Sequence, residues 1–375
     1  MSDTIFDNEK FRWGIGIDDV WNYAGALPPK SIMIPHILRV SLPQGPLSMN
    51  FGRIAAIESQ EPELSTISPT KNSAVRKTEL LKLLSRNLAQ QLSKNGIEFV
   101  RCWFQWNLFQ PEICQGGTQV YRFPLDSFVQ TMNDFGIHII GVIGNGYERF
   151  LPRNLEIDKL RSYVPRLSDS SREIVRHYRR RISMWQLENE PDWWNYHFAS
   201  DWRRGGVWLD RNAGQVILNE LHRIISEEDS GTPTLVNLAA DRSEIFTRCY
   251  SKYCDVIGLD FYPNYANPEL IDLSRLKSRV QEAKKLTGKQ IMITETGYPS
   301  GPRIFGFDMR KQARYVKAVC EEAYSIDSVT SLGLWRLSDP YWFSFPFQEN
   351  SFGLINRQGI PKQAWFEYLN QIKAN

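Results

Sequence analysis

The stretch that decides the fold is Met184-Trp185-Gln186-Leu187-Glu188-Asn189-Glu190-Pro191. It is a short apolar segment that leads directly into carboxylates. A second segment of this kind, Ile291-Met292-Ile293-Thr294-Glu295-Thr296-Gly297, lies further along the chain and also places a glutamate after its apolar residues. Continuous rather than alternating apolarity is typical of strands that are buried on both faces of a parallel sheet.

Strand-like apolar segments of this type recur along the whole chain, and amphipathic helical patterns separate many of them. The predicted strands are 11–17, 99–104, 137–143, 182–187, 234–238, 256–261, 291–294 and 331–337. The predicted helices are 75–95, 126–135, 213–227, 273–286, 310–325 and 363–372. This order predicts a single (β/α)8 TIM barrel that occupies residues 1–375. An open doubly wound sheet is the alternative, but no Gly-rich phosphate loop follows the first strand.

Three predicted connections are long, and each follows a strand: 18–74 after the first, 192–212 after the fourth and 339–352 after the eighth. The first resembles an insertion and is rich in Pro and Ser. The other two are rich in aromatic residues, among them Trp193 and Trp342. Loops that follow the strands of a barrel share its catalytic face, so we expect these three to narrow one substrate cleft to a pocket or short groove.

The composition excludes several classes of protein. The formal net charge is only +3, which argues against nucleic acid or an anionic membrane as the main partner. No apolar run approaches the ~20 residues of a membrane span. The five cysteines form no C-x-x-C pair and are expected to be free thiols, and the five histidines lack metal-site spacing. We expect neither metal nor organic cofactor, and a cytoplasmic location because no signal peptide is visible. The oligomeric state stays open.

Glu190 and Glu295 end two different predicted strands, so a barrel would bring both to one site. Retaining glycosidases need such a pair, in which one carboxyl is a neutral proton donor and the other an ionised nucleophile. A buried Arg101 on the second strand would favour the ionised form of Glu295. Glu188 is a weaker candidate, because no Asn precedes it, although a period of two would place it on the same strand face as Glu190.

Asn189-Glu190-Pro191 after one strand, followed by Glu295 after another, resembles the clan of (β/α)8 retaining glycoside hydrolases. The resemblance implies that the first Glu is the acid/base and the second the nucleophile. It further implies that Asn189 binds the sugar 2-hydroxyl and that Tyr262 donates a hydrogen bond to Glu295. Trp335 would form the floor of the subsite for the cleaved sugar, and Arg101 would lie close to the nucleophile. Ordinary packing is the alternative for Tyr262 and Trp335, and an ion pair with any carboxylate of the barrel is the alternative for Arg101.

Two runs, Glu295-Thr296-Gly297-Tyr298-Pro299-Ser300 and Asp260-Phe261-Tyr262-Pro263, are similar to those of plant-type β-1,3-glucanases. The resemblance implies hydrolysis of a β-linked glucoside or short β-glucan. Asn145, after the third strand, is a further candidate for contact with a sugar hydroxyl or a catalytic residue, and Trp193 and Trp342 are candidates for stacking on sugar rings. A catalytically weak carbohydrate-binding barrel and a transglycosylase remain alternatives. The sugar, the linkage and endo or exo action stay open.

Overall fold

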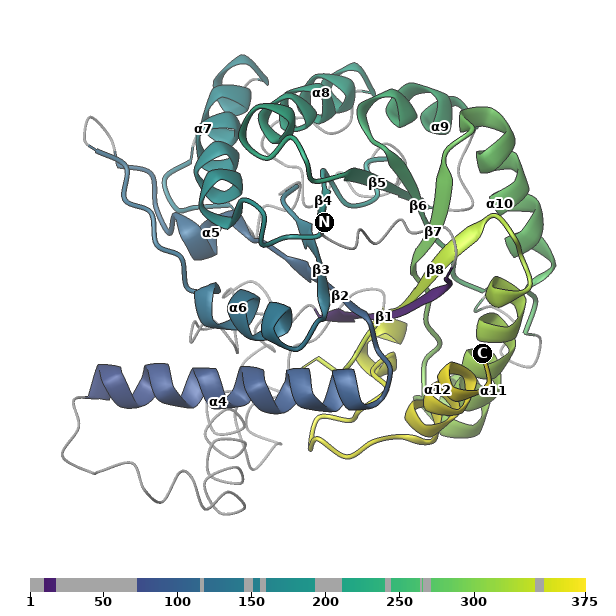
Figure 1. Ribbon diagram of the computed structural model, residues 1–375. Helices are drawn as coiled ribbons and strands as arrows, with labels where there is room; N and C mark the ends of the chain where they lie inside the picture. The colour runs from purple at the N-terminus through teal and green to yellow at the C-terminus, as the bar shows by residue number, and fades with distance from the viewer. Residues whose placement is uncertain are drawn as a thin grey trace.

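The computed structural model describes residues 10–17, 73–114, 118–144, 151–155, 160–192, 211–239, 244–263, 265, 271–340 and 347–375. Eight parallel strands form a closed barrel in the order of the sequence, with helices around it (Figure 1). This confirms the predicted (β/α)8 fold. The long connections predicted after the first, fourth and eighth strands lie mostly outside the described residues.

Each strand coincides with a predicted apolar segment. The strands are β1 (Arg12–Ile17), β2 (Phe99–Trp103), β3 (His138–Val142), β4 (Met184–Gln186), β5 (Thr234–Ala239), β6 (Val256–Asp260), β7 (Gln290–Glu295) and β8 (Val329–Leu334). The last strand starts and ends earlier than predicted, so Trp335 directly follows it. Parallel pairing of β1 with β8, in the register Gly14 with Gly333, closes the barrel.

Helices lie outside the strands. They are α4 (Ser73–Lys94), α5 (Trp106–Phe109), α6 (Asp126–Asp134), α7 (Leu160–Tyr178), α8 (Arg211–Glu228), α9 (Glu244–Tyr250), α10 (Ser274–Thr287), α11 (Met309–Tyr324) and α12 (Gln363–Ala374), with short 3-10 turns at η4 (Ser251–Tyr253), η5 (Arg303–Phe305) and η6 (Phe347–Ser351). All six predicted helices are present. The sequence did not predict α5, α7 or α9. In α7 an internal Pro165 and many charged residues obscure the apolar face that buries Leu167 and Val175.

Buried apolar side chains from six consecutive strands form one cluster: Phe99, Ile140, Met184, Leu235, Val256 and Met292. Gly14 makes room for the Phe99 ring, because a Cβ at this glycine would lie 2.2 Å from that ring. A larger apolar cluster lies between the strands and the helices. The hydroxyl of Tyr368, on α12, donates a hydrogen bond of 2.7 Å to the carbonyl oxygen of Gly14. The last helix is thus attached to the first strand.

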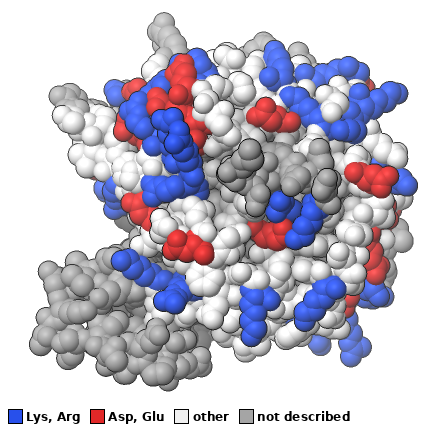
Figure 2. Space-filling model, in the orientation of Figure 1, with Lys and Arg blue, Asp and Glu red and all other residues white. Residues whose placement is uncertain are grey.

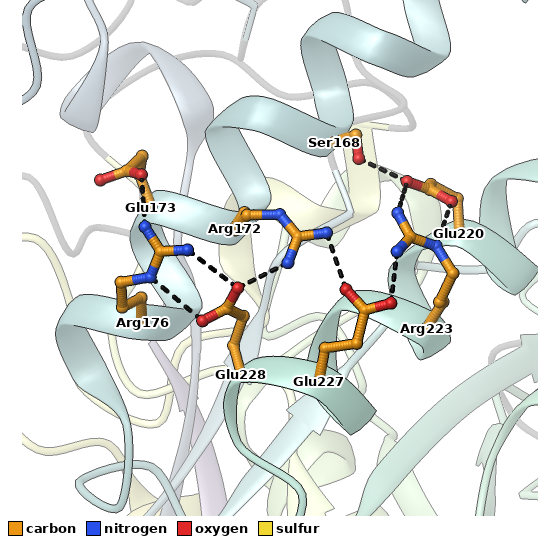
Figure 3. A network of polar contacts seen from close by, with 8 residues as sticks. All are labelled: Ser168, Arg172, Glu173, Arg176, Glu220, Arg223, Glu227 and Glu228. Carbon is orange, nitrogen blue, oxygen red and sulfur yellow. Dashed lines mark hydrogen bonds and ion pairs between the residues drawn. The ribbon is translucent and has the colours of Figure 1, made fainter.

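A network of ion pairs joins α7 to α8 on the outside of the barrel (Figure 3). Arg172 donates to both Glu227 and Glu228, at 2.9 and 2.5 Å, and Arg176 also binds Glu228. Lys and Arg side chains lie beside Asp and Glu over this part of the surface in Figure 2. These side chains are 15–53% exposed, so water partly screens the ion pairs. The network holds together the two helices that flank β4.

Two further expectations concern the whole chain. All five cysteines are free, as predicted from their spacing. Among the described residues, no helix combines the length and apolarity that crossing a membrane requires.

Candidate active site

Arg101 is the centre of a buried polar network at the ends of the strands. It lies in β2 and is 1% exposed. Its Nε donates to Gln186 Oε1 at 2.6 Å, its Nη1 to Glu295 Oε1 at 2.6 Å and its Nη2 to Asn189 Oδ1 at 2.5 Å. One guanidinium therefore joins β2, β4 and β7. The structure brings together Arg101, Asn189 and Glu295, which the sequence placed on three separate strands.

Glu295 is the last residue of β7, and both oxygens of its carboxyl group are bound. Oε1 accepts the hydrogen bond from Arg101, and Oε2 accepts one of 2.8 Å from the hydroxyl of Tyr262. Burial raises the pKa of the Tyr262 hydroxyl, and the charge of Glu295 adds to this effect, so the hydroxyl keeps its proton and acts as a donor. Charge-assisted hydrogen bonds from a cation and a phenol stabilise an ionised carboxylate.

Glu190 lies in a different environment. It follows β4 with a φ of 42°, and its backbone N–H donates to Asn237 Oδ1 at 2.9 Å. Burial raises the pKa of the Glu190 carboxyl well above its usual value, and the nearby carboxyls of Asp260 and Glu295 add to this shift. The surroundings of Glu190 therefore favour its protonated form, whereas Glu295 accepts hydrogen bonds from a cation and a phenol.

Asn237, on β5, is a residue of this site that the sequence did not identify. Its Nδ2 donates to Asn189 Oδ1 at 2.9 Å and to Asp260 Oδ2, and its Oδ1 accepts from Gln186 Nε2 at 2.7 Å. Together with the bond from Glu190, these contacts connect β4, β5 and β6. The signal that could have identified Asn237 and Gln186 is the presence of an amide within a strand that is otherwise apolar and buried.

Asp260 ends β6 and is 2% exposed. Its Oδ1 contacts the Thr294 hydroxyl at 2.6 Å, and its Oδ2 contacts Asn237. Burial raises the pKa of the Asp260 carboxyl well above its usual value, and the charge of Glu295 adds to this shift, while Arg101 opposes it. The sequence identified Asp260 as part of a resemblance and assigned it no role.

The predicted alignment of Glu188 with Glu190 is wrong. The strand ends at Gln186 and Glu190 has a positive φ, so the two-residue period does not extend across positions 188–190. Glu188 is fully buried, and its Oε1 accepts a hydrogen bond of 2.9 Å from the backbone N–H of Asn189. Its backbone passes so close to Gly144 that a Cβ at this glycine would lie 2.4 Å from the Glu188 Cα. Glu188 therefore supports the turn that carries Asn189.

Aromatic side chains lie beside this network. Trp335 packs with Trp103 and Phe352, and the Arg101 guanidinium carbon lies 5.9 Å from the ring centroids of both Trp103 and Trp335. The Tyr262 ring stacks on Phe352 at a centroid distance of 5.7 Å. Three other predicted site residues lie outside the described residues: Asn145, Trp193 and Trp342. Within the described ranges, no cluster of His, Cys, Asp and Glu could hold a metal ion.

Neither a protein-family profile nor a curated protein sequence matches the chain. Solved structures do. The GH5_18 protein of Streptomyces cattleya, in complex with Manb1-4GlcNAc, aligns with a TM-score of 0.65 and 14% identity over 78% of this chain and 75% of its own. Xylanase 10B of Thermotoga petrophila, in complex with xylobiose, aligns with a TM-score of 0.55 and 16% identity over 76% and 89% of the two chains.

The GH2 beta-galacturonidase of Eisenbergiella tayi, bound to galacturonate, aligns with a TM-score of 0.54 and 15% identity over 78% of this chain. The chain spans only 47% of the length of that enzyme. At these identities the likeness defines the class of the fold: a (β/α)8 barrel of the type found in glycoside hydrolases.

Proposed function

We propose that this protein is a retaining glycoside hydrolase in which Glu295 is the nucleophile and Glu190 the acid/base. The observation that carries the proposal is the contrast between two carboxyl groups of one site. Glu295 accepts hydrogen bonds from Arg101 and Tyr262, whereas burial and the charge of Glu295 favour the protonated form of Glu190. Paired carboxyls whose environments favour opposite protonation states are the arrangement that glycoside hydrolysis requires.

The proposed reaction has two steps. In the first, Glu190 protonates the glycosidic oxygen while Glu295 attacks the anomeric carbon, so that the bond to the leaving group breaks and a glycosyl-enzyme ester forms. In the second, the ionised Glu190 takes a proton from water, which attacks the same carbon and releases Glu295. Two inversions give a product with the anomeric configuration of the substrate.

Asn189 and Trp335 are the proposed contacts with the sugar. The Asn189 carbonyl oxygen accepts from both Arg101 and Asn237, which fixes the orientation of its amide at the start of the acidic turn. Under the proposal this amide binds the sugar 2-hydroxyl, and the Trp335 ring forms the floor of the subsite. Asn145, Trp193 and Trp342 remain proposed contacts of the same substrate.

The proposed substrate is a β-linked glucoside or a short β-glucan. The solved structures of similar fold carry different carbohydrates, among them xylobiose, galacturonate and Manb1-4GlcNAc. They support carbohydrate as the substrate class, while the preference for glucose rests on the Glu295-Thr296-Gly297 and Asp260-Phe261-Tyr262 runs. A panel of aryl β-glycosides and β-glucans identifies the sugar.

Two variants test the assignment of roles. Glu295→Gln is expected to abolish formation of the glycosyl-enzyme on every substrate. Glu190→Gln is expected to keep the first step with a dinitrophenyl β-glucoside, whose leaving group needs no proton, and to lose about 10²–10⁴-fold on substrates with poor leaving groups. Burst kinetics measures the first step, and Glu282→Gln, on the exposed surface, is the matched control. If Glu190→Gln and Glu295→Gln lose the burst equally, the assignment of acid/base and nucleophile is wrong. If Glu295→Gln remains active, Glu295 is not the nucleophile.

The stereochemistry gives a second test. Proton NMR of the first sugar released should show the β anomer from a β-glycoside, whereas the α anomer indicates inversion. Adding an alcohol or sugar acceptor separates hydrolysis from transglycosylation, because a transglycosylase forms mainly the acceptor glycoside. A barrel that only binds carbohydrate gives no product in either assay.

A further inference from the structure

Asp260 is a buried carboxyl group that the proposed reaction does not use. It is 2% exposed, lies at the end of β6, and contacts the side chains of Asn237 and Thr294. Both of these partners are neutral. The guanidinium of Arg101 gives its hydrogen bonds to Gln186, Glu295 and Asn189 instead.

The hydrogen bonds of Asn237 show which oxygen of Asp260 can carry a proton. Asn237 Oδ1 accepts from the backbone N–H of Glu190, which can only donate, so the other end of the amide, Nδ2, faces Asp260. Asp260 Oδ2 must therefore accept. The Thr294 hydroxyl lies 2.6 Å from Oδ1 and donates to it when Asp260 is ionised. Because a hydroxyl can also accept, a proton on Oδ1 would reverse this hydrogen bond and keep the same partner.

The charges around Asp260 favour that proton. Burial raises the pKa of Asp260, the carboxyls of Glu295 (β7) and Asp192 (after β4) add to the shift, and Arg101 (β2) is the cation among the described residues that opposes it. The positive charge of Arg101 is bound directly to Glu295. A second buried carboxylate beside this pair would be a charge without a cation of its own, which is costly in a site of low polarity.

We propose that Asp260 is a neutral carboxylic acid in the folded protein, which donates from Oδ1 to Thr294 and accepts at Oδ2 from Asn237. As such it is a positioning residue: it holds the Asn237 amide, which in turn binds Asn189 and the backbone of Glu190. This role rests on the proposed function. The protonation state itself does not, and it can be measured without a substrate.

The Asp260→Asn variant keeps both hydrogen bonds of the neutral acid, because the new Oδ1 accepts from Asn237 and the new Nδ2 donates to Thr294. The Asp260→Leu variant has a side chain of similar size and makes neither hydrogen bond. Asp272 is the control: it is exposed, and hydrogen bonds from Ser274 lower its pKa, so it is ionised at neutral pH.

Infrared spectroscopy tests the protonation state. The spectra are recorded at pH 7 in the Glu190→Gln background, which removes the signal of the Glu190 acid. A C=O band of a protonated carboxylic acid is expected in this background, and it should disappear on adding Asp260→Asn and persist on adding Asp272→Asn. If Asp260→Asn leaves the C=O band of protonated carboxylic acids unchanged, Asp260 is ionised and the proposal is overturned. This outcome does not depend on whether the protein cleaves glycosides.

Kinetics on an aryl β-glycoside tests the positioning role. Asp260→Asn is expected to keep kcat and KM within about threefold of the unsubstituted protein, since all hydrogen bonds persist. It should also leave the basic limb of the pH profile in place. Asp260→Leu is expected to lower kcat about 10–100-fold, because Asn237 loses an acceptor. If Asp260 were ionised, its negative charge would raise the pKa of Glu190, and Asp260→Asn would remove that effect. A basic limb of the pH profile that moves to lower pH in Asp260→Asn therefore contradicts the proposal.

If no variant and no unsubstituted protein cleaves any glycoside, the proposed function fails while the infrared result still decides the state of Asp260. If cleavage is normal and the infrared band is absent, the proposed function stands and the inference about Asp260 is wrong.

Discussion

Replacing Arg101 by methionine removes the cation that connects three strands of the site. The guanidinium is buried and bonds to Glu295 at 2.6 Å. Breaking a buried ion pair from one side costs about 3–5 kcal/mol, because the remaining charge is left without a partner. The entropy of unfolding scales to about 0.8 kcal/mol/K for a chain of 375 residues, so the midpoint of thermal unfolding should fall by about 4–6 °C.

Thermal unfolding measured by calorimetry checks this value, and Arg12→Met is the matched control. Arg12 also lies on an inner strand and pairs with a glutamate, Glu98, at 2.9 Å, but both side chains are partly exposed. Its loss should cost less than that of Arg101, because Glu98 keeps a second cation, Lys10, at 2.9 Å. In the Glu295→Gln background the cost of Arg101→Met should also shrink, because no buried charge is left behind.

Activity should respond as well. Without Arg101, the Glu295 carboxyl keeps, among the described residues, the hydrogen bond from Tyr262. We therefore expect kcat/KM to fall about 10²–10³-fold, the cost of losing one electrostatic contact in an active site. If Arg101→Met destabilises the Glu295→Gln variant as much as the unsubstituted protein, the ion pair is not what Arg101 contributes. The same conclusion follows if Arg12→Met and Arg101→Met lower the unfolding temperature equally.

Three further predictions follow from the structure. Because the pKa of Glu190 is raised, kcat/KM should fall on the basic side of the pH profile as this carboxyl loses its proton, at a pH well above 4.5. This basic limb should be absent from the profile of Glu190→Gln with a dinitrophenyl substrate. Lys362→Met should cost about 3–5 kcal/mol in chemical denaturation, because it leaves the buried Asp339 without its cation at 2.7 Å, and adding Asp339→Asn should recover part of the loss. Gly258→Ala should cost about 1–3 kcal/mol and lower kcat, because its Cβ would lie 2.8 Å from side-chain atoms of both residues that bind Asp260; unchanged kinetics would show that these contacts tolerate displacement.

The sequence contained enough information to place every strand of the barrel. Strands buried on both faces are apolar throughout, so 256–261 and 291–294 stand out without any alternation. The prediction was less accurate where charge obscures the pattern. Helix α7 carries Arg172, Arg176 and an internal Pro165, which mask its apolar face in the sequence. In the structure both arginines pair with Glu228 of α8.

The candidate site was only partly predictable. Glu190 and Glu295 follow strands in recognisable runs, and Arg101 is a cation in an apolar segment. Asn237 and Asp260 are different, because each acts through contacts with residues on neighbouring strands. Such contacts depend on the register between β5, β6 and β7, which includes a shift at Leu259/Asp260. Because these strands are buried on both faces, they show no alternation of apolar and polar residues from which the register could be read.

The closure of the barrel has a consequence for synthesis of the protein. Strand β1 pairs with β8, and the bond from Tyr368 to Gly14 spans 354 positions in the sequence. At about 5–20 residues per second, a ribosome needs roughly 20–70 s to add that length of chain. During this interval the unpaired N–H and C=O groups of β1 and of each newly made strand are open to pairing with other chains. The time of greatest risk of aggregation therefore falls before the last helix has been made.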